Sequence, residues 1–255
     1  MKRNVRNIGI AGALLAAMGL PATATAAEHD GQWHVTGELY LWGADTKLKS
    51  AAGQGVEVDF DDVVSNLEMA FMASLGARKD RWSWFGDVMY VGIDASETVP
   101  AKIPEIPTPL NATVKLEQDA WIVTLGGGYE ISSTPDSHFD VTAGLRYFSL
   151  ETDVSADLGG GLSGSVHDES DVLDAVVGLK GRARLGDKWY LNYYADIGTG
   201  ESDLTWQALA GVNYTLSKVD VGVGYRILQW QLDGSGYLDE FEISGPYALL
   251  AIKFK

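Results

Sequence analysis

The sequence predicts an all-β protein, a transmembrane antiparallel up-and-down β-barrel with ten strands. Three observations predict this fold class. Apolar and polar residues alternate over segments of about ten residues or more, which is longer than an ordinary strand. Short and longer connections alternate between these segments, and no stretch of useful length after the first 27 residues has a helical period.

The chain begins with a segment typical of an export signal. Lys2, Arg3 and Arg6 precede an apolar run at 8–20, and the small residues at 22–27 offer cleavage after Ala26 or Ala27. The apolar run is shorter than the roughly 20 residues that a membrane-spanning helix needs. We therefore expect residues 1–27 to be a signal peptide and residues 28–255 to form one barrel domain.

The ten predicted strands follow one another without a composition break that would suggest a second domain. In chain order they are 33–44, 67–79, 81–95, 114–131, 137–151, 171–185, 188–199, 203–216, 218–231 and 240–254. Each has large apolar residues at every second position, as in the hairpin of Trp206, Val212 and Tyr214 with Val221 and Tyr225.

The connections between the strands differ in length in a regular way. Short turns are expected at 79–80, 132–136, 186–187 and 217–218, and the opposite end carries longer loops at 45–66, 96–113, 152–170 and 232–239 with a brief one at 200–202. An even number of strands with this asymmetry is typical of bacterial outer-membrane barrels. Both termini then lie on the short-turn side, which faces the periplasm.

Two alternatives for the strand number remain open. Loop 45–66 could add a pair of strands, giving twelve, and a misread hairpin would leave eight. Residues 56–67 could instead hold one helical turn, with Asp59 or Asp61 as its cap, or extend the second strand.

Ionisable residues gather on the face of each strand opposite the apolar stripe. The predicted lumen-lining residues are Glu38, Glu68, Arg78, Asp87, Glu130, Asp140, Arg146, Asp174, Lys180, Arg182, Arg184, Asp196, Asp220 and Arg226. A soluble lipocalin-like barrel would show the same period with the two faces exchanged.

Three features favour lipid outside and charge inside. Aromatic residues lie towards both ends of the apolar stripes, as in interfacial girdles, and a Gly–Tyr spacing of three recurs, as at Gly211 and Tyr214, which places glycine on the crowded charged face. The chain also ends on an aromatic strand residue, Phe254, before Lys255. The predicted aromatic girdle is Trp33, Trp82, Tyr90, Trp121, Tyr129, Phe139, Tyr147, Trp189, Trp206, Tyr214 and Phe241.

Several stretches resemble a widespread group of poorly characterised Gram-negative outer-membrane β-barrel proteins. They are FDDVVSNLEMAFM (60–72), WFGDVMYV (84–91), GLRYFSL (144–150), SDLTWQALAGVNYTLS (202–217), VGYRIL (223–228) and GPYALLAIKF (245–254). The resemblance covers nearly all of the chain after residue 27. It implies the fold and the outer-membrane location, and no activity or site.

Composition limits the possible partners. The chain has 35 Asp and Glu against 19 Lys and Arg, for a net charge of −16, which argues against binding nucleic acid. Such an acidic protein suits surroundings rich in divalent cations. There is no cysteine, so the fold has no disulfides. The expected partners are the lipid bilayer, lipopolysaccharide and the barrel-assembly machinery, and the expected state is a monomer.

The nearly balanced charges of the inner face predict a plugged or very narrow lumen, because a buried charge needs a partner. We expect a structural or surface-interaction role. The alternative is a narrow pore for small solutes or ions.

An enzyme, such as a barrel hydrolase, is less favoured. Of the four histidines only His167 lies on the loop side, and no nucleophile motif accompanies it. No cofactor and no defined metal site are expected. The acidic loop residues could attract Ca²⁺ or Mg²⁺ weakly, and they are Asp153, Asp157, Asp168, Glu169 and Asp171.

Overall fold

A computed structural model of the protein describes residues 31–50, 55–58, 67–101, 110–157, 163–232 and 238–254. The regular elements of these residues are all β-strands. None of the described residues belongs to a helix long and apolar enough to cross a bilayer. The predicted signal segment 1–27 lies outside the described residues.

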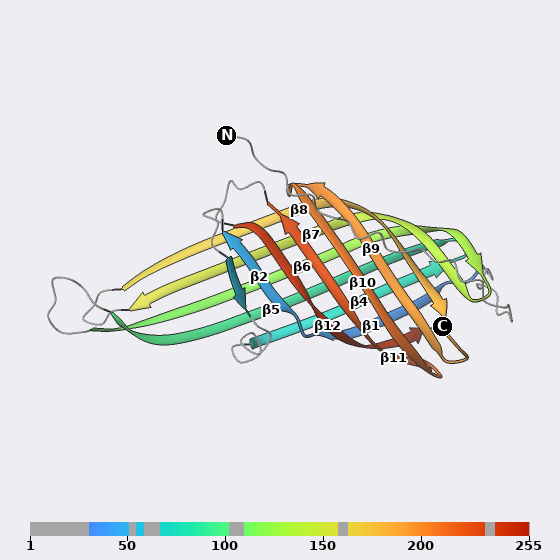
Figure 1. Cartoon of the computed structure of the whole chain (residues 1–255), viewed down its shortest axis with the longest axis horizontal. Helices are drawn as coiled ribbons and strands as arrows, with labels where there is room; N and C mark the ends of the chain where they lie inside the picture. Colours follow the sequence, from blue (N-terminus) through green and yellow to red (C-terminus); the bar gives the residue numbers. More distant parts are fainter. Residues whose placement is uncertain are drawn as a thin grey trace.

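Ten antiparallel strands form a closed barrel, as predicted (Figure 1). The first strand, β1 (His34–Trp42), pairs with the last, β12 (Leu238–Phe254), and so closes the ring. Between them lie, in chain order, β4 (Leu67–Lys79), β5 (Trp82–Ala101), β6 (Leu110–Thr134), β7 (Ser137–Asp157), β8 (Ser163–Arg184), β9 (Trp189–Gly200), β10 (Leu204–Leu216) and β11 (Val219–Gln231).

The region 45–66 contributes a hairpin that adds no strand to the ring. β2 (Asp45–Ser50) pairs with the first part of β12, and β3 (Gly55–Val58) pairs with β2. β12 thus changes partner from β2 to β1 near Gly245, whose carbonyl accepts a hydrogen bond from the Trp42 indole at 3.1 Å. Residues 56–58 and Leu67 are in strands rather than in a helix, and residues 59–66 of the suggested helical turn lie outside the described residues.

Strands β5 to β8 are longer than the sequence pattern predicted. Pairing continues to Ala101 opposite Leu110 and to Asp157 opposite Ser163, so most of the expected loops 96–113 and 152–170 are strands instead. The apolar stripe ends before these strands do, and the first nine residues of β8, 163–171, are exposed on both faces. Figure 1 shows them projecting beyond the rest of the barrel.

Tight turns join the strands at the opposite end. Asp80 and Ser217 have positive φ values of 52° and 61°, as short hairpin turns require. At the β6–β7 turn the Thr134 hydroxyl accepts hydrogen bonds from the amides of Asp136 and Ser137. Since Val35 lies opposite Phe254 and His34 opposite Arg78, both ends of the barrel domain are on this short-turn side.

The two faces of the barrel are inverted relative to a soluble protein. Outward positions hold exposed apolar residues such as Leu41 (75% exposed) and Val223 (64%), while Arg146 and Asp140 inside are fully buried. A continuous outer surface of this kind is unfavourable in water and is the surface that lipid surrounds in transmembrane barrels.

Glycines on the inner face make room for large side chains. A Cβ on Gly211 would lie 2.3 Å from the Tyr247 hydroxyl, and one on Gly126 would lie 2.5 Å from the Phe85 ring. The space that the Gly–Tyr spacing provides is therefore filled by aromatic side chains at these two positions rather than by charged ones.

Introducing a charged side chain on the outer face should affect stability differently in the lipid-facing part of the barrel and in the projecting strands. We expect Val223→Arg, in the middle of the outer face of β11, to destabilise the folded barrel by about 2–4 kcal/mol. Val166 is similarly exposed (68% against 64%) but lies on the projecting part of β8, where Arg would cost roughly 0.5 kcal/mol or less. Urea unfolding in lipid vesicles measures both, and equal effects of the two changes would contradict a lipid-covered outer face.

Candidate functional site: the barrel interior

The structure divides the predicted lumen-lining residues into three groups. Seven are buried: Glu130, Asp140, Arg146, Asp174, Asp196, Asp220 and Arg226. Five are half-buried inside the barrel, namely Glu38, Arg78, Asp87, Lys180 and Arg182. Arg184 lies at the short-turn rim, 3.7 Å from Asp136, and the side chain of Glu68 is not among those described.

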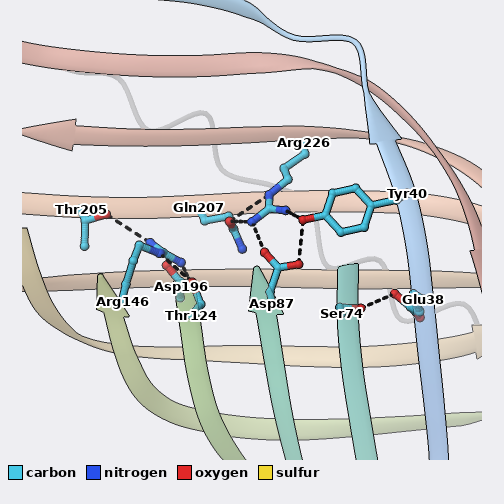
Figure 2. Close-up of polar contacts among 10 residues, drawn as sticks. All are labelled: Glu38, Tyr40, Ser74, Asp87, Thr124, Arg146, Asp196, Thr205, Gln207 and Arg226. Carbon is cyan, nitrogen blue, oxygen red and sulfur yellow. Dashed lines mark hydrogen bonds and ion pairs between the residues drawn. The ribbon is translucent and has the colours of Figure 1, made fainter. Parts of the chain in front are cut away.

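Two buried arginines form a polar layer across the middle of the lumen (Figure 2). Arg226 on β11 donates to Asp87 at 2.9 Å, to the Tyr40 hydroxyl at 3.0 Å and to Gln207, while Tyr40 itself donates to Asp87 at 2.8 Å. These contacts join β11 to β5, β1 and β10.

The second arginine of this layer, Arg146 on β7, pairs with Asp196 on β9. It also donates to the hydroxyls of Thr205 at 3.1 Å and Thr124 at 3.3 Å. We call Arg146 and Arg226 with these partners the arginine layer. Because hydrogen bonding in a low dielectric is strong and an unpaired buried charge is costly, the layer holds its strands at fixed separations.

An aromatic plug fills the lumen on the loop side of this layer. It consists of Trp42, Phe148, Trp230 and Phe241, packed with Met89, Ile122, Val172, Leu228 and Tyr247. Phe148 stacks on Trp230 and Phe241 with ring centroids 4.8 and 5.0 Å apart. These residues come from seven strands around the ring, so the plug occupies the whole cross-section rather than one wall.

The plug and the arginine layer contact each other. The Arg226 guanidinium lies 5.0 Å from the ring centroid of Trp42, and that of Arg146 lies 6.0 Å from Trp230. Cation–π attraction of this kind contributes about 1–2 kcal/mol in a desolvated site. The two together form a continuous seal.

The prediction that Phe241 belongs to the outer aromatic girdle is wrong. Phe241 is 5% exposed and pairs with Trp230 in the β11–β12 register, which places both side chains on the inner face. The plug itself was missed from the sequence. The sequence does contain a signal for the plug, because residues an even number of positions apart on a strand share a face. Trp42, Phe148 and Trp230 lie on the same faces as the inward-facing Tyr40, Arg146 and Arg226, further towards the loops.

The other predicted girdle residues lie on the outer face at both ends of the barrel. Exposed members are Trp33, Trp82, Trp121, Tyr129, Tyr147 and Trp189, and half-buried ones are Tyr90, Phe139, Trp206 and Tyr214. Near the short turns Trp82 packs edge-on against Tyr129 at 5.0 Å and Trp189 against Tyr214 at 4.8 Å. Near the loops Tyr90 packs against Trp121 at 4.7 Å.

Four buried carboxylates hold other parts of the interior together. Asp174 accepts from the amide and hydroxyl of Ser202 at 2.9 and 2.7 Å and so fixes the β9–β10 turn. Near the short turns Arg78 bridges Glu130 and Asp140, and Asp220 accepts from Lys253 and the Tyr190 hydroxyl.

The projecting strands carry the acidic residues of the predicted loops. His167 Nδ1 lies 3.0 Å from Asp153 and 4.0 Å from Glu151, and all three side chains are exposed. Their ligand atoms are close enough together to hold a cation. No hydroxyl nucleophile hydrogen-bonds to His167 among the described residues. His34 and His138 lie inside, near the short turns, and His29 is outside the described residues.

Comparison with known proteins supports the fold. No protein-family model and no curated protein matches the chain. The translocator domain of the autotransporter NalP from Neisseria meningitidis is similar in structure, with a TM-score of 0.52 and 14% identity over 89% of this chain and 90% of that one. The outer-membrane protease OmpT from Escherichia coli aligns with a TM-score of 0.45 and 10% identity over 91% and 99% of the two chains. The similarity to the NalP domain shows that the two chains share a fold.

Removing one arginine of the layer leaves its partner carboxylate buried and unpaired. We expect Arg226→Ala to lower the free energy of unfolding by about 3–5 kcal/mol. Arg184→Ala at the rim, whose side chain is 40% exposed, should cost less than about 1 kcal/mol. Denaturant unfolding in detergent micelles compares them, and an Arg226→Ala protein as stable as the Arg184→Ala one would contradict the role of the layer.

The neighbouring carboxylates stabilise the charged form of His167. The hydrogen bond with Asp153 raises the pKa of His167 above its usual value of 6.5, and the charge of Asp153 adds to this effect. His167 should therefore keep its proton to a higher pH than an ordinary histidine, and Asp153→Asn should lower the pKa towards 6.5. An NMR titration with a chelator present measures this, and an unchanged pKa in the variant would contradict the pairing.

Proposed function

We propose that the protein is an integral protein of the bacterial outer membrane with a structural or surface-interaction role. The fold, the apolar outer face and the charged interior support this location. In the proposed orientation the short turns and both termini face the periplasm and the projecting strands β5 to β8 face outward. The barrel acts as a monomer, with the bilayer, lipopolysaccharide and the assembly machinery as its partners.

The main support for a structural or surface-interaction role is the seal across the lumen. Phe148, Leu228 and Trp230 are each 0% exposed, and the arginine layer lies directly beneath them. A solute would have to displace stacked rings and break paired charges to pass. This supports a barrel that anchors its outward strands and does not conduct.

A narrow pore is the second candidate. It is favoured by a hollow of about 440 Å³ that adjoins the arginine layer on its short-turn side. If the protein is a pore, the aromatic plug has to move before a solute or ion can pass.

Planar-bilayer recordings distinguish the two roles. We expect no unitary currents from the unchanged protein across salts and voltages, because the plug excludes water from the loop-side half. Replacing Phe148 and Trp230 together by Ala removes two stacked rings and should produce small, steady currents. Exchanging the outer-face Trp206 for Ala is the matched control and should leave the membrane silent. Currents from the unchanged protein would favour the pore.

The projecting strands supply the surface for interaction. Asp119, Glu151, Asp153 and Glu169 lie on one face of β6, β7 and β8 in adjacent register. This face lies just beyond the girdle residues Trp121 and Tyr147, at the expected level of lipid headgroups. Ca²⁺ or Mg²⁺ bound weakly by these carboxylates would bridge them to the phosphates of lipopolysaccharide. The proposal assigns no reaction to His167.

A further inference from the structure

The short-turn half of the lumen is a blind cavity. Its upper part has a volume of about 440 Å³ and reaches the arginine layer, where Asp87 and Arg226 form part of its wall. A second hollow of about 530 Å³ continues it to the turns, and residues such as His138 and Arg182 line both. Cavities of these sizes fall in the range that small ligands occupy in proteins.

Two cations in this cavity have no carboxylate partner. Arg78, Arg226 and Lys253 form salt bridges, but Lys180 and Arg182 form none with any described residue. Each lies instead over an aromatic ring. Lys180 Nζ is 4.8 Å from the Phe85 ring centroid, and the Arg182 guanidinium is 3.4 Å from that of Tyr190.

These ring contacts fix the cations without using their N–H donors. Lys180 and Arg182 are two residues apart on β8, so both side chains face the cavity as close neighbours. Two like charges side by side repel each other, and their neighbour Asp140 is already bound through Oδ2 by Arg78 and Ser83. An anion between them would relieve this repulsion and accept from both.

The opposite wall limits what else the ligand can carry. β1 lies across the ring from β8 and presents Glu38, which accepts a hydrogen bond from Ser74 at 2.8 Å and forms no salt bridge. Glu38 would repel a second anionic group. Tyr194 on β9, whose ring packs 5.8 Å from that of Phe85, adds aromatic surface for an uncharged body.

We propose that this cavity binds a small organic molecule with one carboxylate or phosphate group, held by Lys180 and Arg182, and a neutral or cationic remainder. The ligand enters from the short-turn side. An ammonium and a guanidinium together form charge-assisted hydrogen bonds with either kind of anion. The site goes beyond the proposed function and does not depend on whether the barrel conducts.

Isothermal titration calorimetry on the complete barrel domain in uncharged detergent tests the site. The probes are benzoate for carboxylates and phenyl phosphate for phosphates, with benzyl alcohol and benzamidine as neutral and cationic controls. We expect one or both anions to bind at low salt and neither control to do so. Binding of only one of the two anions shows whether the site takes a carboxylate or a phosphate. Binding of neither overturns the proposal.

Variants then assign the binding to the two cations. Changing Lys180 and Arg182 together to Gln should weaken anion binding by about tenfold or more, while Arg184→Gln, at the rim of the same strand, should change it by about twofold or less. Glu38→Gln should strengthen anion binding, because it removes the opposing charge. Affinities unchanged by both the double change and Glu38→Gln would overturn the proposal.

Discussion

The contact on which the interior depends is the ion pair between Arg226 and Asp87. The two residues are 139 positions apart in the chain, and their side chains meet inside the ring. Tyr40 and Gln207 complete the arrangement, so that four strands are tied to one guanidinium. A closed barrel can deform by sliding or flattening, and a buried, fully hydrogen-bonded charge resists both because any displacement leaves a polar group unpaired.

The arginine layer also divides the lumen into two environments. On the loop side the aromatic and aliphatic residues of the plug pack against one another. On the short-turn side ionisable residues such as Lys180 and Arg182 line a hollow. The strands of the barrel wall run through both halves, and the inward side chains differ. One barrel therefore holds both a seal and a cavity.

Much of this fold could be predicted from the sequence, because alternation on long strands is dictated by a lipid exterior. The ring of ten strands and the short turns near Asp80 and Ser217 follow from that pattern and from turn geometry. The far parts of β5 to β8 could not be predicted, since strands in water on both faces lose the alternation that identifies them. Phe241 was placed outside because an aromatic residue near a loop fits a girdle as well as a plug. The difference lies in its register with Trp230, which is set by pairing between strands.

The seam between β1 and β12 has a consequence for how the molecule is made. The residues that close the ring, from Tyr247 to Phe254, are the last ones described in the chain, and they meet some of the first, from Val35 to Trp42. Until β12 has paired with β1, two unsatisfied edges remain, and such edges attract other β-strands. A chain that lacks β12 would therefore form an open, self-associating sheet.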